Sequence, residues 1–424
     1  MNSIIVFIFC LGYLAILLEQ YTQLNKTALA LITGAICWSI IAITSPSNSF
    51  IIDKLQHHMV DIGALMFFLL GAMTIVETID IHDGFQNIAS FIQTNNKLRL
   101  VSLVALISFF LSAILDNLTT TIVLMSILNK VVEDKKSKWL LLSLVIIAAN
   151  AGGAWSPIGD VTTTMLWIGG QVTSWNIIHQ TFLASFTSLA VASVLIYYKI
   201  DRQITIKKVL SQNEDFTSNN NERNIVLGIG VLSLLFVPLF KSITGLPPFM
   251  GMLFCLGLMW LITGFLHRNK KTEEKGLLSV SHALHKIDVQ SILFFTGILL
   301  AVAALETIGS LGQIAIFLEQ KLRAPTLIAA AVGVLSAIFD NIPLVAGLQN
   351  MYSLQQYPTD HYFWELLAFC AGTGGSIFII GSAAGVIVMG IEKVSFSWYV
   401  KNISWIAFIS FLTGIIVYIL QQQF

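Results

Sequence analysis

Charged residues are scarce in this chain of 424 residues, and their scarcity argues against a soluble fold. Lys, Arg, Asp and Glu together make up 11% of the residues, whereas soluble domains carry about 25%. Hydrophobic residues make up 56%, and they gather in blocks that approach the roughly 20 residues needed to cross a bilayer. The formal net charge is zero, so no nucleic-acid partner is expected. We predict an all-α polytopic membrane protein surrounded by the lipid bilayer.

Cysteine is also rare, and its spacing points to no redox or metal chemistry. The chain has four cysteines, all in apolar segments and none in a CxxC motif, so we expect them to be small packing residues. No cofactor is predicted. The first apolar stretch, 4–18, has no basic run before it. We therefore interpret it as a membrane helix and not as a removable signal.

The sequence contains an internal repeat. LSAILDN at 111–117 returns as LSAIFDN at 335–341, and ETI at 77–79 returns at 306–308. Gly-Gly and Ser-Trp pairs follow in the same order in both halves. Matches at a nearly constant offset indicate two copies of one unit.

Each copy is predicted to hold a helical hairpin and a discontinuous helix, because its Gly-rich break separates two apolar segments of half length. The predicted units follow in chain order: N-terminal membrane helices at 1–59; repeat one at 60–199, with a hairpin at 98–132 and a broken helix at 139–170; a linker at 200–287, with membrane helices at 224–243 and 248–266; repeat two at 288–424, with a hairpin at 326–352 and a broken helix at 362–391.

Basic residues predict the orientation of the chain. With each hairpin returning to the side it entered, 19 of the 23 Lys and Arg fall on one side of the membrane. The positive-inside rule makes that side cytoplasmic. Both termini are then external, and the two repeats are inverted relative to each other. Inverted repeats are the usual architecture of alternating-access carriers.

Five carboxylates are predicted to lie at bilayer depth, where each costs about 2.5–3.5 kcal/mol. They are Glu77, Asp116, Asp160, Glu306 and Asp340. The same blocks contain no Lys or Arg, so bound cations or protons are the expected partners. Glu77 and Glu306 are expected near the ends of their helices, where they either line a proton pathway or reach the interface.

The hairpin tips carry the first group of candidate ligands. Asp116-Asn117, followed by Thr120, and Asp340-Asn341 supply the charged and neutral oxygens that a hard cation such as Na⁺ requires. An alternative is that each Asp only caps the following helix. Capping and ion binding can also coexist.

The Gly-rich breaks carry the second group. Glycines and Pro157 interrupt the helix, and unpaired backbone at that depth is tolerated where it lines a cavity or holds an ion; close packing of small residues is the alternative. The candidates are Asn150, Ser156, Asp160, Thr162 and Thr163 in repeat one, and Thr373, Ser376 and Ser382 in repeat two. We predict Na⁺ at Asp116, Asn117, Asp160, Thr162 and Thr163, with more charge from repeat one. Proton coupling is expected at the same residues and at Asp340 and Asn341.

Enzyme motifs are not supported. GTGGSIFIIG lacks the Lys-Ser/Thr of a phosphate-binding loop. The IGD segment at 158–160 lacks the first glycine of the GxGD pattern of intramembrane aspartyl proteases, since Pro157 stands there. No enzyme activity is predicted.

Several segments resemble the signatures of NhaD-type sodium/proton antiporters, within a larger ion-transporter superfamily. They are DNLTTTIVLMSIL at 116–128, ANAGGAWSPIGDVTTTMLWIGGQ at 149–171, FDNIP at 339–343 and the Gly-rich stretch 372–385. The resemblance implies exchange of cytoplasmic Na⁺, and of Li⁺, for external H⁺ by alternating access. It assigns importance to Asp116, Asn117, Asn150, Asp160, Thr162, Thr163, Asp340 and Asn341.

The superfamily resemblance also implies a homodimer and leaves an alternative function. Its anion-carrying members have a neutral Ser at the hairpin tips, where this chain has Asp116 and Asp340. An arsenite or carboxylate permease of the same superfamily is the second hypothesis, and the two aspartates argue against it. The N-terminus shows no transit-type sequence, so we expect a bacterial inner membrane.

Overall fold

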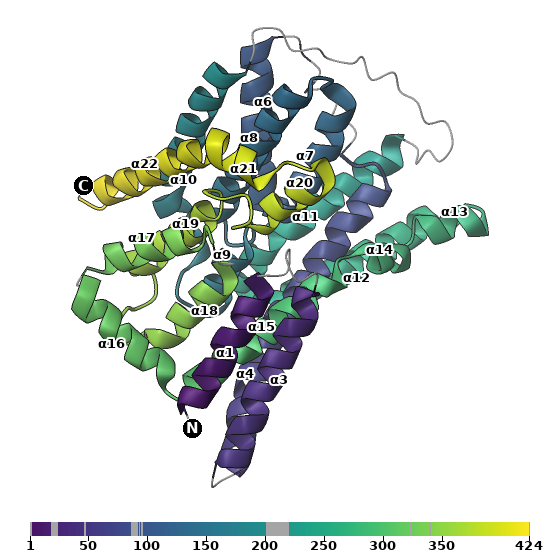
Figure 1. Ribbon diagram of the computed structural model, residues 1–424. Coiled ribbons are helices and arrows are strands. Elements are labelled where there is room, and N and C mark those ends of the chain that lie inside the picture. The colour runs from purple at the N-terminus through teal and green to yellow at the C-terminus, as the bar shows by residue number, and fades with distance from the viewer. Residues whose placement is uncertain are drawn as a thin grey trace.

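The computed structural model describes residues 2–17, 24–45, 48–85, 92, 94, 96–200, 220–322, 324–338 and 341–423. Within these ranges, nine helical spans are long and apolar enough to cross a membrane. The N-terminus lies near the lower edge of the molecule in Figure 1, and the C-terminus lies at its left edge. The predicted all-α membrane fold is confirmed.

The N-terminal region forms a group of long helices. It consists of α1 (Asn2–Leu17), α3 (Lys26–Thr44) and α4 (Asn48–Ile81). α4 begins 12 residues before the apolar block at 60–79 and holds 34 residues, or about 51 Å at 1.5 Å per residue. That length exceeds the roughly 30 Å of a hydrocarbon core. The polar first turns of α4, which carry His57 and His58, are therefore helical.

The first repeat contains a hairpin followed by a broken helix. The hairpin is α6 (Lys97–Leu115) and α7 (Asn117–Val131), and Asp116 alone separates the two helices. The broken helix is α8 (Lys135–Ala154) and α9 (Val161–Ile168), after which α10 (Ser174–Lys199) returns across the molecule. α8 begins in the charged segment at 135 and is longer than the apolar block at 139–149 suggested.

The second repeat has the same order of elements. Its members are α15 (Val289–Thr307), α16 (Ser310–Leu322), the hairpin helices α17 (Pro325–Leu335) and α18 (Asn341–Met351), the broken helix α19 (Tyr362–Gly374) and α20 (Ala383–Glu392), and α21 (Phe396–Tyr399), η1 (Val400–Ser404) and α22 (Trp405–Gln421). α7 packs against α20, and α18 packs against α9. Each hairpin therefore contacts the broken helix of the other repeat. The predicted inverted repeats are confirmed, whereas the domain limits remain a prediction.

Matching glycines hold each broken helix against its hairpin. A Cβ on Gly152 would lie 2.2 Å from the Phe109 carbonyl oxygen, and one on Gly374 would lie 2.0 Å from that of Gly333. Beside these contacts, the Ser112 hydroxyl donates to Ala149 O (2.6 Å) and the Ser336 hydroxyl donates to Ala371 O (3.1 Å). The repeated LSAI segments therefore serve as close-packing faces in both repeats.

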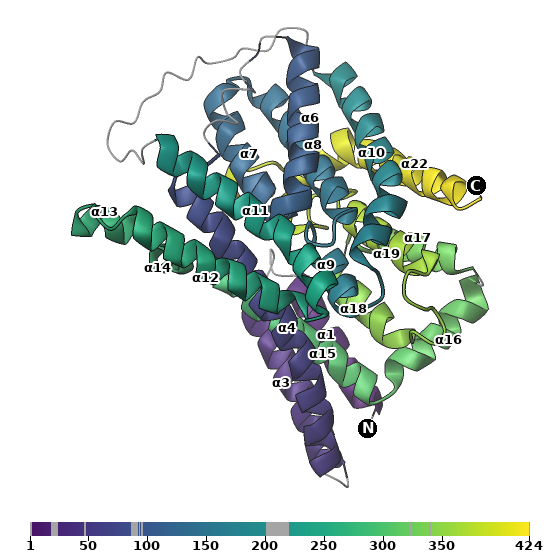
Figure 2. The ribbon, with the colours of Figure 1, turned by 180° about the vertical axis from the view of Figure 1, so that it is seen from behind.

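Two further helix pairs complete the structure. α11 (Asn220–Thr244) and α12 (Pro248–Leu266) pack on α4, and the linker beyond them contains the short helices α13 (Thr272–Leu277) and α14 (Val280–Lys286). α13 projects at the left of Figure 2, whereas α14 packs against α4. The last part of the predicted linker, 267–287, is therefore largely helical.

The turns that follow α9 and α18 are joined across the repeats. The Asp360 carboxylate accepts from the Thr173 amide (2.6 Å) and from its hydroxyl (2.9 Å). The Asp360 amide donates to Gln171 O (2.8 Å) and the Thr359 hydroxyl donates to Gly170 O (2.7 Å). We call these four hydrogen bonds the loop clasp.

Candidate functional site

Asp160 lies in the break of the first broken helix. It is the residue before α9, it is 3% exposed, and its side chain does not cap that helix. The Thr162 hydroxyl donates to Asp160 Oδ2 at 2.9 Å. The break is secured by Ser156, whose hydroxyl donates to Ala113 O (2.5 Å), and by Thr164, whose hydroxyl donates to Pro157 O (2.9 Å). The carboxylate is therefore held at a fixed place inside the protein.

Both hairpins reach Asp160. Asn117 Nδ2 lies 3.5 Å from Oδ1, and Asn341 Nδ2 lies 3.5 Å from Oδ2. Asn117 is the first residue of α7 and Asn341 is the first residue of α18. Three helix N-termini therefore meet at one carboxylate, and their partial positive charge favours its ionised form.

A second line of polar groups joins this centre to the other broken helix. Asn117 Nδ2 donates to Asn150 Oδ1 (3.0 Å), and Asn150 Nδ2 donates to the Ser376 hydroxyl (2.8 Å). The Tyr399 hydroxyl donates to the Ser376 carbonyl (2.8 Å). Of the predicted residues, the structure thus joins six through direct hydrogen bonds: Asn117, Asn150, Asp160, Thr162, Asn341 and Ser376.

Two threonines on the same helices have buried hydroxyls. Thr120 on α7 and Thr163 on α9 are each fully buried. Within the described ranges their hydroxyl oxygens have no hydrogen-bond partner. A buried hydroxyl without a partner carries a desolvation cost of about 1–3 kcal/mol, which a bound cation could offset. These hydroxyls are therefore candidate ligands.

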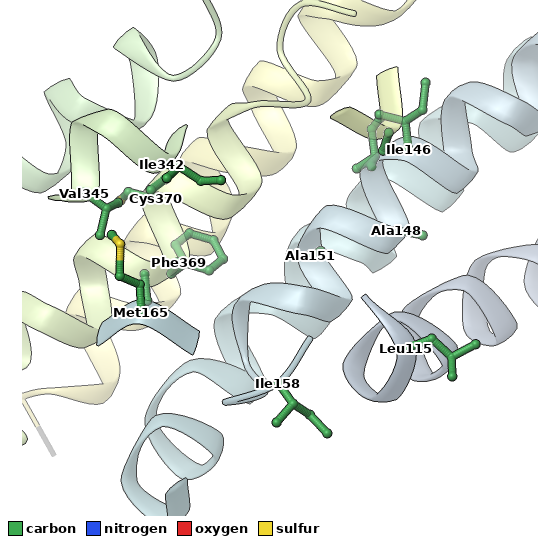
Figure 3. Close-up of a cluster of buried hydrophobic side chains, with 14 of the residues drawn as sticks. Leu115, Ile146, Ala148, Ala151, Ile158, Met165, Ile342, Val345, Phe369 and Cys370 are labelled. Atoms are coloured by element: carbon green, nitrogen blue, oxygen red, sulfur yellow. The ribbon is translucent and has the colours of Figure 1, made fainter. Parts of the chain in front are cut away.

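Apolar side chains surround the break from several elements. Met165 of α9 lies beside Val345 of α18 and Cys370 of α19, while Leu115 and Ile158 lie on the other side of α8 (Figure 3). The buried core includes all of them. Such surroundings exclude bulk water and strengthen electrostatic interactions at Asp160.

Asp116 lies at the tip of the first hairpin, between α6 and α7. Both of its carboxylate oxygens accept from Thr119, one from the amide (2.7 Å) and one from the hydroxyl (2.9 Å). Its φ of 100° is a conformation that few non-glycine residues adopt. Asp116 therefore caps α7, and its part in ion binding stays a prediction.

The remaining predicted residues lie apart from Asp160 or outside the described ranges. The Thr373 hydroxyl donates to Phe369 O within α19 (2.5 Å), and the Ser382 hydroxyl accepts from Gly385 N (3.3 Å) at the start of α20. Glu77 lies 3.9 Å from Lys286, and Glu306 lies 3.8 Å from His58. Asp340 lies outside the residues that the structure describes.

The sequence analysis missed one deeply buried carboxylate. Glu365 on α19 is 1% exposed, the Tyr418 hydroxyl donates to its Oε2 at 2.7 Å, and Asn176 Nδ2 donates to its Oε1. Its position within the apolar block 362–372 could have revealed it. These two donors satisfy the carboxylate locally, so its evident role is to join α10, α19 and α22.

No metal-binding group of three or more His, Cys, Asp or Glu occurs in the described part of the chain. A site such as this one, with one carboxylate among amides and hydroxyls, suits a weakly held cation that is transported. It does not suit a resident transition metal, which prefers imidazole and thiolate ligands.

Comparisons with known proteins agree with this architecture. The family described as CitMHS, "Citrate transporter", matches residues 13–368. Sodium/proton antiporter 1 of Arabidopsis thaliana is 45% identical over 97% of this chain and 71% of its own length. The Na(+)/H(+) antiporter NhaD of Alkalimonas amylolytica is 29% identical over 97% of this chain and 89% of its own length.

A solved structure shows the same fold. The Alcanivorax borkumensis YdaH transporter matches with a TM-score of 0.50 and 11% identity, over 92% of this chain and 95% of its own. The predicted resemblance to NhaD-type proteins is confirmed. The chain therefore belongs to the CitMHS citrate-transporter family, among its NhaD-type members, and is a multi-pass membrane transporter.

Proposed function

We propose that the protein exchanges cytoplasmic Na⁺, and also Li⁺, for external H⁺ at one shared site centred on Asp160. The observation that carries the proposal is the meeting of both hairpin tips at this buried carboxylate, through Asn117 and Asn341. The names of the relatives, sodium/proton antiporter 1 and NhaD, support the same pair of substrates.

The groups around Asp160 suit a small hard cation. Carboxylate, amide and hydroxyl oxygens are the ligands that such ions prefer. An Asn that donates to the empty carboxylate can rotate its amide by about 180° and present oxygen to a bound ion, because terminal sp³–sp² torsions are broad and roughly two-fold. The buried hydroxyls of Thr120 and Thr163 would add further oxygens.

Competition at one carboxylate explains coupling. Burial favours the neutral, protonated form of a carboxyl group, whereas three helix N-termini and a bound Na⁺ favour the ionised form. Asp160 can therefore hold a proton or balance a cation, but not both. Na⁺ from the cytoplasm displaces the proton, and protons from outside displace Na⁺ after the site opens outward.

The same groups disfavour citrate as the substrate. Citrate carries about three negative charges at neutral pH, and its recognition requires basic side chains. The residues joined at Asp160 are a carboxylate, three asparagines and hydroxyl groups. A negative charge at Asp160 would repel the anion.

Orientation, location and assembly complete the proposal. Because 19 of the 23 basic residues fall on one side, we assign that side to the cytoplasm and both termini to the exterior. We further propose a bacterial inner membrane and a homodimer, the latter from the superfamily resemblance.

The test is Na⁺-induced dequenching of a ΔpH-sensitive dye in everted vesicles. Wild type is compared with Asp160→Asn, and Asp134→Asn is the matched control. Asp134 caps the same broken helix at its other end, through Ser137, and is solvent-exposed. We expect Na⁺- or Li⁺-dependent dequenching in wild type and in Asp134→Asn, and none in Asp160→Asn.

Two outcomes would contradict the proposal. Dequenching that survives in Asp160→Asn would move the coupling carboxylate elsewhere. Absence of dequenching in wild type with either cation, together with uptake of labelled citrate, would favour the carboxylate-permease alternative.

A further inference from the structure

A polar cavity of about 310 Å³ lies between the long helices α4 and α15 and the half-helices α9 and α18. We call it the outer cavity. From α4 it is lined by His57, His58, Asp61, Ile62 and Leu65, whose spacing places them on one face of the helix. Met165, Ile168 and Gly169, which follow Asp160 along α9, also line it. The nearest of them, Met165, is five residues from Asp160 in the sequence, or about 7.5 Å at 1.5 Å per residue.

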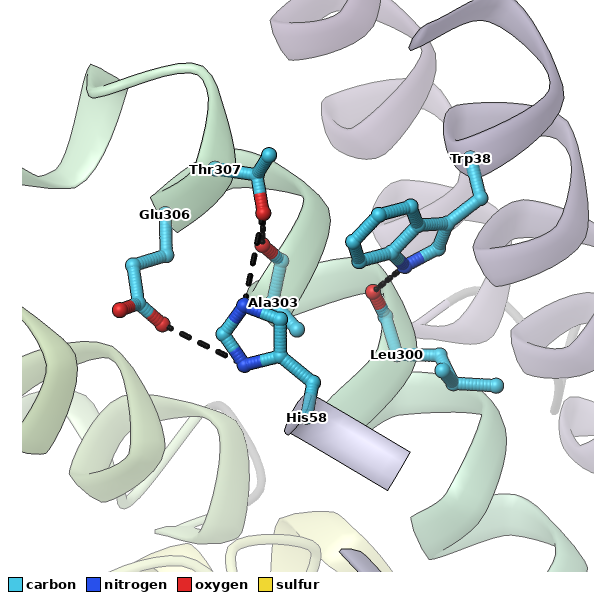
Figure 4. A network of polar contacts seen from close by, with 6 residues as sticks. All are labelled: Trp38, His58, Leu300, Ala303, Glu306 and Thr307. Atoms are coloured by element: carbon cyan, nitrogen blue, oxygen red, sulfur yellow. Dashed lines mark hydrogen bonds and ion pairs between the residues drawn. The ribbon is translucent and has the colours of Figure 1, made fainter. Parts of the chain in front are cut away.

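His58 and Glu306 face each other at this cavity (Figure 4). His58 Nδ1 lies 3.8 Å from Glu306 Oε2. On the opposite side of the ring, His58 Nε2 lies 3.4 Å from the Thr307 hydroxyl. When that hydroxyl donates its proton to Ala303 O (2.9 Å), it accepts from His58 Nε2. In this tautomer, Nδ1 faces Glu306 and is the atom that gains or loses a proton.

The His58 ring and the Glu306 carboxylate can share one exchangeable proton. With Nδ1 unprotonated and Glu306 ionised, a lone pair and a carboxylate face each other, which is unfavourable. Glu306 Oε2 is buried and has no hydrogen-bond partner in the described part of the chain. A proton on either group relieves the contact, and so does a cation placed against the carboxylate.

Other charged groups near the His58–Glu306 pair influence its electrostatics. Lys54, His57 and Asp61 of α4 all interact electrostatically with Glu306. From α9 and α18 the cavity lining contains amides and apolar groups, and none of those lining residues is titratable. Trp38 of α3 lies with its ring 5.9 Å from that of His58. Lys241 of α11 donates to Trp167 O (2.6 Å), just before the lining residue Ile168.

The equivalent glutamate of the first repeat has a different partner. Glu77 occupies the ETI position that Glu306 occupies in the second repeat, and it lies 3.9 Å from Lys286. A lysine keeps its charge at every physiological pH, whereas a histidine changes charge near pH 6.5. Of these two pairs, the one at the outer cavity is therefore the one whose glutamate loses its positively charged partner as the pH rises.

We propose that the outer cavity is a second cation site, separate from Asp160, that is opened by loss of the proton shared by His58 and Glu306. With the proton bound the pair is electrically balanced, and the cavity does not hold a cation. Without it, the Glu306 carboxylate and Asp61 hold a monovalent cation of the Na⁺ class. Its place as the outer waiting position for the transported ion rests on the proposed function above.

The first experiment measures the half-saturating Na⁺ concentration separately on each membrane face, in right-side-out and everted vesicles. The variants are Glu306→Gln and His58→Gln, with Glu77→Gln as the matched control. Glu306→Gln is expected to raise the KM for Na⁺ about tenfold on the outer face only, as expected for a lost charged ligand. His58→Gln is expected to remove the dependence of that KM on outer pH between about 5 and 7, and Glu77→Gln is expected to leave the outer KM unchanged. An outer KM and pH dependence unchanged in both His58 and Glu306 variants would overturn the inference.

The second experiment needs no transport. In purified Asp160→Asn protein, whose main site is disabled, Na⁺ at pH 8 is expected to raise the unfolding temperature, and the rise is expected to vanish at pH 5 or on adding Glu306→Gln. No rise with Asp160→Asn alone, or a rise that survives both substitutions, would overturn the outer site. A wild type that shows this binding but no Na⁺-dependent proton movement would instead refute only the proposed exchange.

Discussion

The two repeats share a backbone plan and differ in the polar groups attached to it. Gly152 and Gly374 occupy matching close contacts between hairpin and broken helix. At the two breaks, however, Asp160 precedes α9 whereas Ser382 precedes α20. Asn150 in the first repeat is matched by Gly372 in the second, which lies against the Asp160 carboxylate. The repeats therefore supply a symmetric frame for an asymmetric site.

That difference has a physical reason. Two carboxylates a few ångströms apart in a low-dielectric site cannot both ionise easily. One Asp with neutral groups from the other repeat keeps a single charge that either a proton or a monovalent cation can balance. The close backbone contacts are therefore alike in the two repeats, whereas the residue before the second half-helix is charged in the first repeat and neutral in the second.

The largest effect is expected from making the first break resemble the second. Asp160→Ser should abolish Na⁺-dependent dequenching, with at least about a hundredfold loss, because it removes the carboxylate that Asn117 and Asn341 share. Adding Ser382→Asp should not restore it, because Gly372 and not an amide stands where Asn150 would be needed. Recovery in the double variant would show that the two breaks are interchangeable.

The next largest effect is expected from disturbing the glycine contacts between each hairpin and its broken helix. Gly152→Ala and Gly374→Ala should each lower stability by about 1–3 kcal/mol, because the new methyl group meets a carbonyl oxygen. Gly390→Ala in α20 meets no atom within 4 Å and should be neutral or slightly stabilising. The buried thiols of Cys37, Cys255 and Cys370 allow unfolding to be followed with a thiol-reactive dye. Unequal losses of stability in Gly152→Ala and Gly374→Ala would show that the hairpin and broken helix do not pack equally tightly in the two repeats.

A smaller effect should separate the two hairpin tips. Asn117 contacts both Asp160 and Asn150, whereas Asn341 contacts Asp160. Asn117→Ala should therefore raise the KM for Na⁺ about tenfold, and Asn341→Ala by a few-fold. Dequenching at graded Na⁺ concentrations measures both values. Equal shifts would mean that the Asn117–Asn150 bond adds nothing to ion binding.

The smallest effect concerns the two ends of α4. Its outer end places His58 beside a carboxylate, whereas just beyond its other end His82 Nε2 lies 3.3 Å from His267 Nε2. Burial, with a contribution from His82, lowers the pKa of His267 to about 4, and burial also lowers the pKa of His82.

A lowered pKa in the folded state means that the unfolded chain binds more protons, so stability is present above about pH 6.5 and falls as the pH drops towards 4. We expect unfolding at pH 5.5 to be easier than at pH 7.5, and the difference to shrink in His267→Gln. The same pH difference in this variant would assign the sensitivity to other groups.

The sequence alone predicted the membrane class, the inverted repeats and most of the polar residues at the site. Repetition of LSAI-Asp-Asn and the glycine pairs carried that prediction, because both features are local. It placed Asp116 in the ion site and allowed that this residue also caps a helix; the hydrogen bonds to Thr119 show the cap, and ion binding by Asp116 stays a prediction. It also missed the pairing of His58 with Glu306, which lie 248 positions apart and become neighbours only through the packing of α4 on α15.

The loop clasp bears on how the protein changes shape. Four hydrogen bonds tie the turn after α9 to the segment before α19, so these ends of the two repeats are fastened to each other. Separating the repeats at that end would break all four. A displacement of α9 and α18 together, sliding as one unit along α4 and α15, would break none of them. Such sliding would take place at the walls of the outer cavity, which would widen and narrow with every transport cycle.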